Sequence, residues 1–141
     1  MPGAFTIDEP RGLVLSRGWG ILTDDELLTH ARVLGADPRF RGDFAQLADL
    51  LGVSEVQTTS AGIQELAAIN PFGPGSRRAL VVSRGAAYGF GRMYQIVRKD
   101  DRDELEIFHD LDSALGWLGF AEAKKELIAA LAGAPEVKAV A

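Results

Sequence analysis

The sequence predicts an α/β protein with a single, mostly parallel β-sheet, an antiparallel hairpin at its N-terminal edge, and helices mainly on one face. Three observations predict this class. Segments with the apolar pattern of strands alternate with segments of helical periodicity. The first two strands are joined only by the turn Pro10–Gly12, a connection too short for parallel pairing. The later strands are separated by helix-length segments, which predicts parallel pairing through right-handed crossovers.

Composition limits the class of protein and the kinds of site. A chain of 141 residues that is 47% hydrophobic suits one domain with its own core. We predict this domain over residues 1–134, with a C-terminal helix over 121–134 and a flexible tail over 135–141. The absence of cysteine excludes disulfides and thiolate sites. A net charge of -5 argues against nucleic-acid binding, no apolar run approaches the roughly 20 residues of a membrane span, and no secretory signal is visible. We therefore expect a cytoplasmic protein.

The N-terminal third contains two strands and a helix. Ala4–Glu9 alternates apolar and polar residues, and Leu13–Trp19 is a mainly apolar segment. Thr23 and Glu26 form a capping box that predicts a helix start. His30 falls at the edge of the apolar stripe of this helix, and no partner is spaced for it, so we expect a residue at the rim of the core.

Two apolar segments in the middle of the chain predict strands buried on both faces. These are Asp43–Leu51 and Arg78–Ser83. Between them, Thr58–Gly62 offers several N-cap hydroxyls before a helix, and Asn70–Gly75 predicts a loop.

A further helix is expected over Ala86–Lys99. Phe90, Met93 and Val97 share one of its faces, which we predict packs on the sheet. The Gly89–Gly91 segment inside this helix indicates close packing rather than a phosphate-binding loop, because it lacks a third glycine and no strand-to-helix turn surrounds it.

The opposite face of that helix is a candidate interaction face, formed by Tyr88, Arg92 and Gln95. Tyrosine and arginine are enriched at binding hot spots. The alternative is a solvated helix face in which Arg92 stacks over Tyr88.

The segment Glu104–Phe120 combines a strand, a helix cap and an amphipathic helix. Asp110 is positioned to cap the helix, Leu115 and Leu118 lie on its apolar stripe, and Gly119 suits a left-handed helix end.

Polar residues near the C-terminal ends of predicted strands suggest a second candidate site. Asp49, Ser83 and His109 would lie at the sheet edge where α/β proteins gather ligands, although Asp49 also suits a loop cap. Ser83, His109 and Asp110 could be combined as a catalytic triad, but nothing resembling a nucleophile elbow surrounds Ser83. We predict no catalytic residue, no metal site and no cofactor, because two histidines without cysteine supply too few ligands for zinc.

Several motifs together resemble a known family. They are Leu13–Gly20, Thr23–Leu27, Asp37–Phe40, Gln46–Leu50, Tyr88–Tyr94 and Ile107–Leu118. This set, spread over about residues 5–120, resembles the SpoIIAA-like proteins of bacteria, which share the STAS fold and are often labelled STAS/SEC14-domain proteins.

The resemblance implies a non-enzymatic regulatory or protein-binding module. Some STAS relatives are switched by serine phosphorylation at the start of the helix after the third strand, and the matching positions here are Ser60 and Thr59, without the family's acidic residue. CRAL-TRIO relatives bind lipids, which implies the alternative of a small-molecule or lipid carrier with a pocket at the C-terminal strand edge for an apolar or anionic ligand. We expect a protein partner. Helices on one face leave the other sheet face to be covered, either by the C-terminal helix or by a second subunit, and this placement together with the apolar stripe of the C-terminal helix leads us to expect a homodimer.

Overall fold

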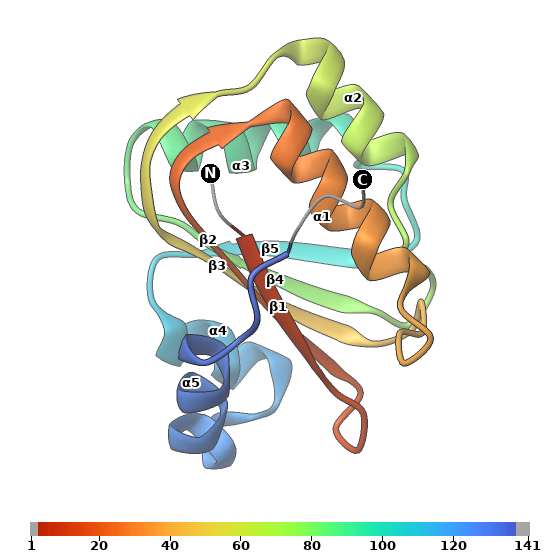
Figure 1. Ribbon diagram of the computed structural model, residues 1–141, viewed down its shortest axis with the longest axis vertical. Coiled ribbons are helices and arrows are strands. Elements are labelled where there is room, and N and C mark those ends of the chain that lie inside the picture. Colours follow the sequence, from red (N-terminus) through yellow and green to blue (C-terminus); the bar gives the residue numbers. More distant parts are fainter. Residues whose placement is uncertain (1–2, 138–141) are drawn as a thin grey trace.

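Five strands form one sheet whose spatial order is their order in the chain. The computed structural model describes residues 3–137 (Figure 1). The strands are β1 (Gly3–Asp8), β2 (Leu13–Thr23), β3 (Ala45–Gln57), β4 (Arg77–Val81) and β5 (Glu104–Phe108). β1 pairs with β2 in antiparallel orientation and the remaining neighbours are parallel, which confirms the predicted sheet with its N-terminal hairpin.

Helices cover both faces of this sheet, three on one side and two on the other (Figure 1). They are α1 (Asp24–Ala36), α2 (Ser60–Ala68), α3 (Ala86–Val97), α4 (Leu111–Leu118) and α5 (Lys124–Ala132), with the 3-10 turn η1 (Ala121–Ala123) before α5. The helices that connect parallel strands, α1 to α3, share one face, as right-handed crossovers between neighbouring strands require. α4 and α5 follow the last strand and pack on the opposite face.

Apolar cores lie on both sides of the sheet, and a further cluster is formed by residues of β1, β2 and α1 together with Phe72. The core under α1, α2 and α3 includes Leu50, Leu80 and Phe90. The core under α4 and α5 is built from Leu13, Leu15, Leu47, Ala79, Val81, Ala114, Leu115, Leu118, Leu127 and Leu131. The face that was expected to need a cover, either the C-terminal helix or a second subunit, is therefore covered in part by the chain's own C-terminal helices.

Helix ends follow the capping residues that the sequence contains. Thr23 Oγ1 accepts the Glu26 backbone N–H at 3.4 Å, and Asp110 Oδ1 accepts that of Ser113 at 2.7 Å. Gly119 has the predicted left-handed conformation, with φ of 88°. Side-chain acceptors satisfy backbone donors that have no partner inside the helix, so local sequence determines where these two helices begin.

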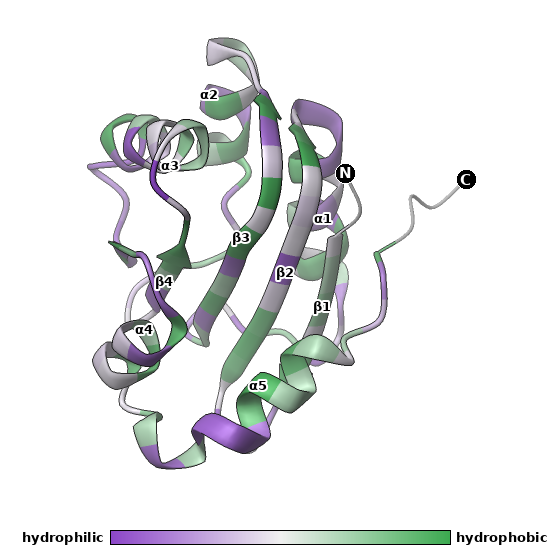
Figure 2. Cartoon of the chain, turned by 90° about the vertical axis from the view of Figure 1, so that its left-hand side faces the viewer, coloured by the Kyte–Doolittle hydropathy of each residue, from purple (hydrophilic) through white to green (hydrophobic). Residues whose placement is uncertain are grey.

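Two strands extend beyond the predicted segments. β2 continues to Thr23 and β3 to Gln57, with irregular pairing near Gly18 and Gly20. Figure 2 shows the C-terminal parts of β2 and β3 reaching toward α2, away from α4 and α5. Ile21 remains exposed on the extension of β2, and Leu51 is exposed on β3 just before its extension.

The predicted packing face of α3 is wrong in part. Phe90 is buried, but Met93 and Val97 are exposed, and the buried stripe instead contains Ala87, Gly91 and Tyr94 besides Phe90. A Cβ atom on Gly91 would lie 3.2 Å from Leu80 Cδ2, so the helix approaches the sheet through its small residues. Close packing is confirmed at Gly91 but not at Gly89, where a Cβ atom would have nothing within 4 Å, and Met93 and Val97 face solvent.

The chain returns to the N-terminal edge after α5. Glu136 forms an isolated antiparallel bridge with Ala4, and the Val137 backbone N–H donates to the Gly3 carbonyl at 2.6 Å. These contacts fix the first residues of the expected tail beside β1; its remainder, 138–141, lies outside the described residues. None of the helices within residues 3–137 has the length and apolar character that crossing a bilayer requires.

Candidate functional site

Three neighbouring strands each direct one polar side chain into the core between the sheet and α1–α3. These residues, Ser16 on β2, Gln46 on β3 and Arg78 on β4, are here called the polar row, and all three are buried. Gln46 pairs with Arg78 in register, and Gln46 Nε2 donates to Ser16 Oγ at 3.1 Å. Burying polar groups costs free energy unless each finds a partner, so the contacts of the row decide its role.

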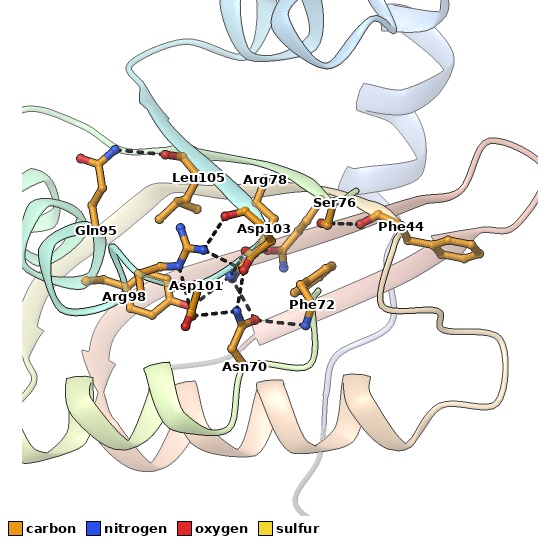
Figure 3. Close-up of polar contacts among 12 residues, drawn as sticks. Phe44, Asn70, Phe72, Ser76, Arg78, Gln95, Arg98, Asp101, Asp103 and Leu105 are labelled. Carbon is orange, nitrogen blue, oxygen red and sulfur yellow. Dashed lines mark hydrogen bonds and ion pairs between the residues drawn. The ribbon is translucent and has the colours of Figure 1, made fainter. Parts of the chain in front are cut away.

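The guanidinium of Arg78 is the centre of this row (Figure 3). Its Nε donates to Gln46 Oε1 at 3.0 Å, and its Nη1 lies within hydrogen-bonding distance of Asn70, Tyr94 and Asp103. The guanidinium also lies over the Phe72 ring, 4.4 Å from its centroid. Burial opposes the charge on Arg78, but Tyr94 and Asp103 outweigh that effect and its pKa is raised. Arg78 is therefore a permanent buried cation.

Asp103 connects Arg78 to a second buried arginine. Its Oδ2 lies 3.2 Å from Arg78 Nη1, and its Oδ1 lies 2.7 Å from Arg98 Nη2. Asn70 Nδ2 also donates to Asp103 Oδ1 at 2.9 Å, as the dashed lines in Figure 3 show. We call Arg78, Arg98 and Asp103 the ion cluster. Asp101 joins from the margin, 3.6 Å from Arg98 Nε, and its side chain is 35% exposed.

His30 of α1 lies at the other end of the polar row. Its Nε2 is 3.1 Å from Ser16 Oγ, and its ring meets that of Phe5 edge-on at 5.5 Å between centroids. Burial lowers the pKa of His30 to about 4, so the imidazole is neutral at pH 7. The rim position expected from the sequence agrees with its partial exposure, but the expectation that it lacks a partner is wrong.

A cavity of about 100 Å³ lies beside the polar row. Its apolar wall includes Leu50, Leu66, Leu80, Phe90 and Leu105, and its polar wall includes Ser16, His30, Gln46, Asn70, Arg78 and Tyr94. A largely apolar cavity with a few convergent polar groups and a shifted pKa is the usual form of a small-molecule site.

The residues proposed for a strand-edge pocket lie elsewhere. Asp49 is within β3, level with the last residue of β4, and its Oδ1 accepts the Leu51 backbone N–H at 2.9 Å. His109 Nδ1 donates at 2.8 Å to the carbonyl of Val82, which is the residue before Ser83. These residues gather around the C-terminal end of β4, yet none of Asp49, Ser83 and His109 lines the 100 Å³ cavity.

The candidate interaction face on α3 is divided between solvent and the sheet. Tyr88 and Arg92 are exposed, and the Tyr88 ring lies 5.5 Å from that of His109. Gln95 is half-buried because its Nε2 donates to the Leu105 carbonyl at 3.0 Å, and it also accepts a hydrogen bond from Arg92. Arg92 does not stack over Tyr88 among the cation–π contacts of the described residues.

The two candidate phospho-acceptors differ in their contacts. Thr59 is the N-cap of α2: its hydroxyl accepts the Gly62 N–H at 3.0 Å and donates to Asp24 Oδ2 at 2.6 Å. Ser60 is exposed at the first position of α2. Because the Asp24 carboxylate already occupies the start of α2, an anion added to Thr59 would meet a like charge.

The sequence did not identify the polar row or the ion cluster as a site. Asp103 lies in a charged turn, and its partners Arg78 and Arg98 are 25 and 5 positions away. The sequence contains one signal of the ion cluster: Arg78 is a charged residue in a segment predicted to be a buried strand. Buried arginine is rare unless it is paired. Within residues 3–137, no group of three or more histidine, aspartate or glutamate side chains is arranged to hold a metal ion.

Comparison with known proteins bears on the fold. No protein-family model and no curated protein matches the chain. A crystal structure of an uncharacterised protein of the DUF3478 family from Shewanella loihica PV-4, described as having a SpoIIAA-like fold, superimposes with a TM-score of 0.56. The two sequences are 16% identical, and the match covers 84% of this chain and 95% of that chain. The chain therefore has a SpoIIAA-like fold, as the sequence resemblance implied.

Proposed function

We propose that this protein is a non-enzymatic regulatory module that binds another protein through the exposed side of α3. One observation carries the proposal: α3 presents three large apolar side chains to solvent, with Met93 45% exposed, Ile96 55% and Val97 37%. Isolated exposed apolar residues are ordinary, but a contiguous group on one element is typical of an interaction surface. We call Met93, Ile96 and Val97 the α3 patch.

Helix geometry makes the α3 patch continuous with the face predicted from the sequence. Arg92 and Ile96 are one turn apart, as are Tyr88 and Arg92, so these three side chains follow one another along the helix. Met93 and Val97 form the adjacent row. An apolar centre flanked by arginine and tyrosine has the composition of a binding hot spot. The partner we propose presents an apolar surface with a carboxylate positioned for Arg92.

The alternative function has less support. A carrier with its pocket at the C-terminal strand edge needs polar groups free to meet a ligand. Asp49 and His109 instead bond to backbone groups within their own sheet region. The 100 Å³ cavity is a separate site with other residues.

Capture and titration with matched variants test the proposal. The bait is the full chain, used as wild type, as Ile96→Asp, and as Leu51→Asp, which places the same charge on another exposed apolar residue. Partners from native cells are identified by mass spectrometry, produced separately, and titrated against all three baits. We expect Ile96→Asp to abolish binding and Leu51→Asp to retain it. Equal affinity of all three for every recovered partner would refute the role of α3.

The partner could be a second copy of this chain. We therefore keep the homodimer expected from the sequence as a proposal, now formed through α3. The exposed Ile96 supports it, whereas the original reason is weakened because α4 and α5 cover part of the second sheet face. Sedimentation should show a wild-type dimer that Ile96→Asp converts to a monomer. A monomeric wild type at high protein concentration would exclude the dimer.

A further inference from the structure

The 100 Å³ cavity has hydrogen-bond donors without acceptors. Among residues 3–137, no hydrogen bond uses Arg78 Nη2, although Nε and Nη1 are both engaged. The Tyr94 hydroxyl accepts from Arg78 Nη1 at 3.0 Å, and no acceptor in this part of the chain takes its own proton. Both side chains line the cavity, and 11% of the Arg78 side chain remains exposed. Among the described residues, Arg78 Nη2 is not one of the fully buried atoms that lack a partner, so it opens onto accessible space in which an acceptor from outside can reach it.

The charge of the cavity wall favours an anionic acceptor. No aspartate or glutamate lines the cavity, and His30 is neutral at pH 7. Asp103 is shared between Arg78 and Arg98, and the partly exposed Asp101 lies 3.6 Å from Arg98 Nε, so Arg78 shares its one carboxylate with a second cation. Arg17 also borders the cavity; its Nη2 donates to the Ala132 carbonyl of α5, its guanidinium lies over the Trp19 ring, and its Nε is buried without a partner. Arg78 therefore differs from Arg17 in that its unused donor, Nη2, is open to the cavity rather than buried.

The remaining wall and the volume restrict the anion. Apolar atoms, including those of leucine and phenylalanine side chains, form most of the surface, which disfavours strongly hydrated anions such as phosphate and favours an apolar chain. An enclosed apolar cavity of about 150 Å³ accepts benzene, which has six non-hydrogen atoms, so by proportion 100 Å³ encloses about four. Because this cavity is partly open, roughly one or two further atoms of a ligand can extend toward its mouth.

We propose that the cavity binds a short-chain monocarboxylate of three or four carbons. The carboxylate accepts hydrogen bonds from Arg78 Nη2 and the Tyr94 hydroxyl, and the alkyl chain lies against Leu50, Leu66 and Phe90. The site is distinct from the α3 patch and from the strand-edge residues, and it does not depend on the proposed protein partner.

Calorimetric titration of the full chain with sodium butyrate at pH 7 and constant ionic strength tests this site. We expect saturable binding of one butyrate per chain, with n-butanol and n-butylamine at least roughly tenfold weaker because neither supplies an anionic acceptor. Butyrate should also raise the melting temperature. The absence of saturable heat up to tens of millimolar butyrate, or equal affinity for butanol, would overturn the assignment.

Two variants locate the binding. Tyr94→Phe should weaken butyrate binding roughly tenfold, whereas Tyr88→Phe, which changes the other tyrosine of the chain outside the cavity, should leave it unchanged. Ala31→Leu fills the cavity without removing a polar group and should abolish binding even if Tyr94→Phe folds poorly. Unchanged affinity in a folded Ala31→Leu protein would place butyrate elsewhere and refute the proposal.

Discussion

The two faces of the central strands differ in what they bury. On β2, β3 and β4, the residues that point toward α4 and α5 include Leu15, Leu47 and Ala79, which form a wholly apolar core. Alternate residues on the same strands point toward α1–α3 and include Gln46 and Arg78. Apolar packing alone would also stabilise the face that meets α1–α3. Because this face instead buries the ion cluster, a neutral histidine and a cavity, we infer that it is constrained by more than folding stability.

The ion cluster offers the largest expected effect. Asp103→Asn leaves Arg78 and Arg98 buried without their shared carboxylate, and we expect the free energy of unfolding to fall by about 3–5 kcal/mol. Asp101→Asn is the control, because the partly exposed Asp101 should contribute less than about 1 kcal/mol. Urea unfolding measures both. Equal small losses would mean that the ion cluster is not a constraint on this face.

The apolar face should respond to cavity creation instead. Leu118 of α4 is 8% exposed and packs in the second core, so Leu118→Ala should cost about 2–5 kcal/mol through lost transfer energy and the cavity left behind. Leu51→Ala, at an exposed site, should change the free energy of unfolding by about 0.5 kcal/mol or less. Urea melts of Leu118→Ala that overlay those of the wild type would contradict the packing of α4.

His30 should make the polar face sensitive to pH. Its pKa is about 4 in the folded protein against an ordinary value of 6.5, so the unfolded chain binds the proton more readily between these values. The stability associated with neutral His30 is complete above pH 6.5 and is lost as the pH falls toward 4. The loss should be at most about 3 kcal/mol, and less in practice because the ring retains some solvent access.

The variant His30→Gln isolates this contribution, since it keeps a polar group near Ser16 without titrating. As the pH falls from 7 to 4.5, the free energy of unfolding of the wild type should decrease relative to that of His30→Gln. A difference that does not change with pH would show that His30 titrates alike in the folded and unfolded states.

The smallest effect concerns the proposed phosphorylation near the start of α2. Thr59→Asp should be about 1 kcal/mol less stable than the neutral Thr59→Asn, because the new carboxylate meets Asp24. Ser60→Asp should be near neutral, since Ser60 is exposed at the first position of α2. Thermal melts compare the three. A Thr59→Asp protein as stable as Thr59→Asn would remove the argument that favours Ser60 as the acceptor.

The fold could be predicted from the sequence because its signals are local. A hydroxyl at Thr23, a carboxylate at Asp110 and a glycine at Gly119 determine helix ends through contacts within one turn. Which face of α3 points toward the sheet could not be predicted in the same way. Its inward face is set by the close approach of Gly91 to Leu80, and the expectation that large apolar residues point inward therefore fails there.

The candidate site could not be predicted for a related reason. Arg78 meets Asp103 only because two strands and a turn bring residues 25 positions apart together. The cavity depends on how three helices pack over the polar row, which no local pattern encodes. The sequence did identify Tyr88 and Arg92 as exposed residues of α3, but Gln95, predicted for the same face, is half-buried against Leu105.

Site-specific photo-crosslinking tests most directly whether the α1–α3 side recognises a partner while the α4–α5 side stabilises the fold. A photoreactive residue is placed in living native cells at Ile96 of α3 or at Ala129 of α5, both exposed. We predict a discrete protein adduct from position 96, lost when Arg92→Ala is added, and none from position 129. Equal adducts from both positions, or an adduct from position 129 alone, would contradict the account.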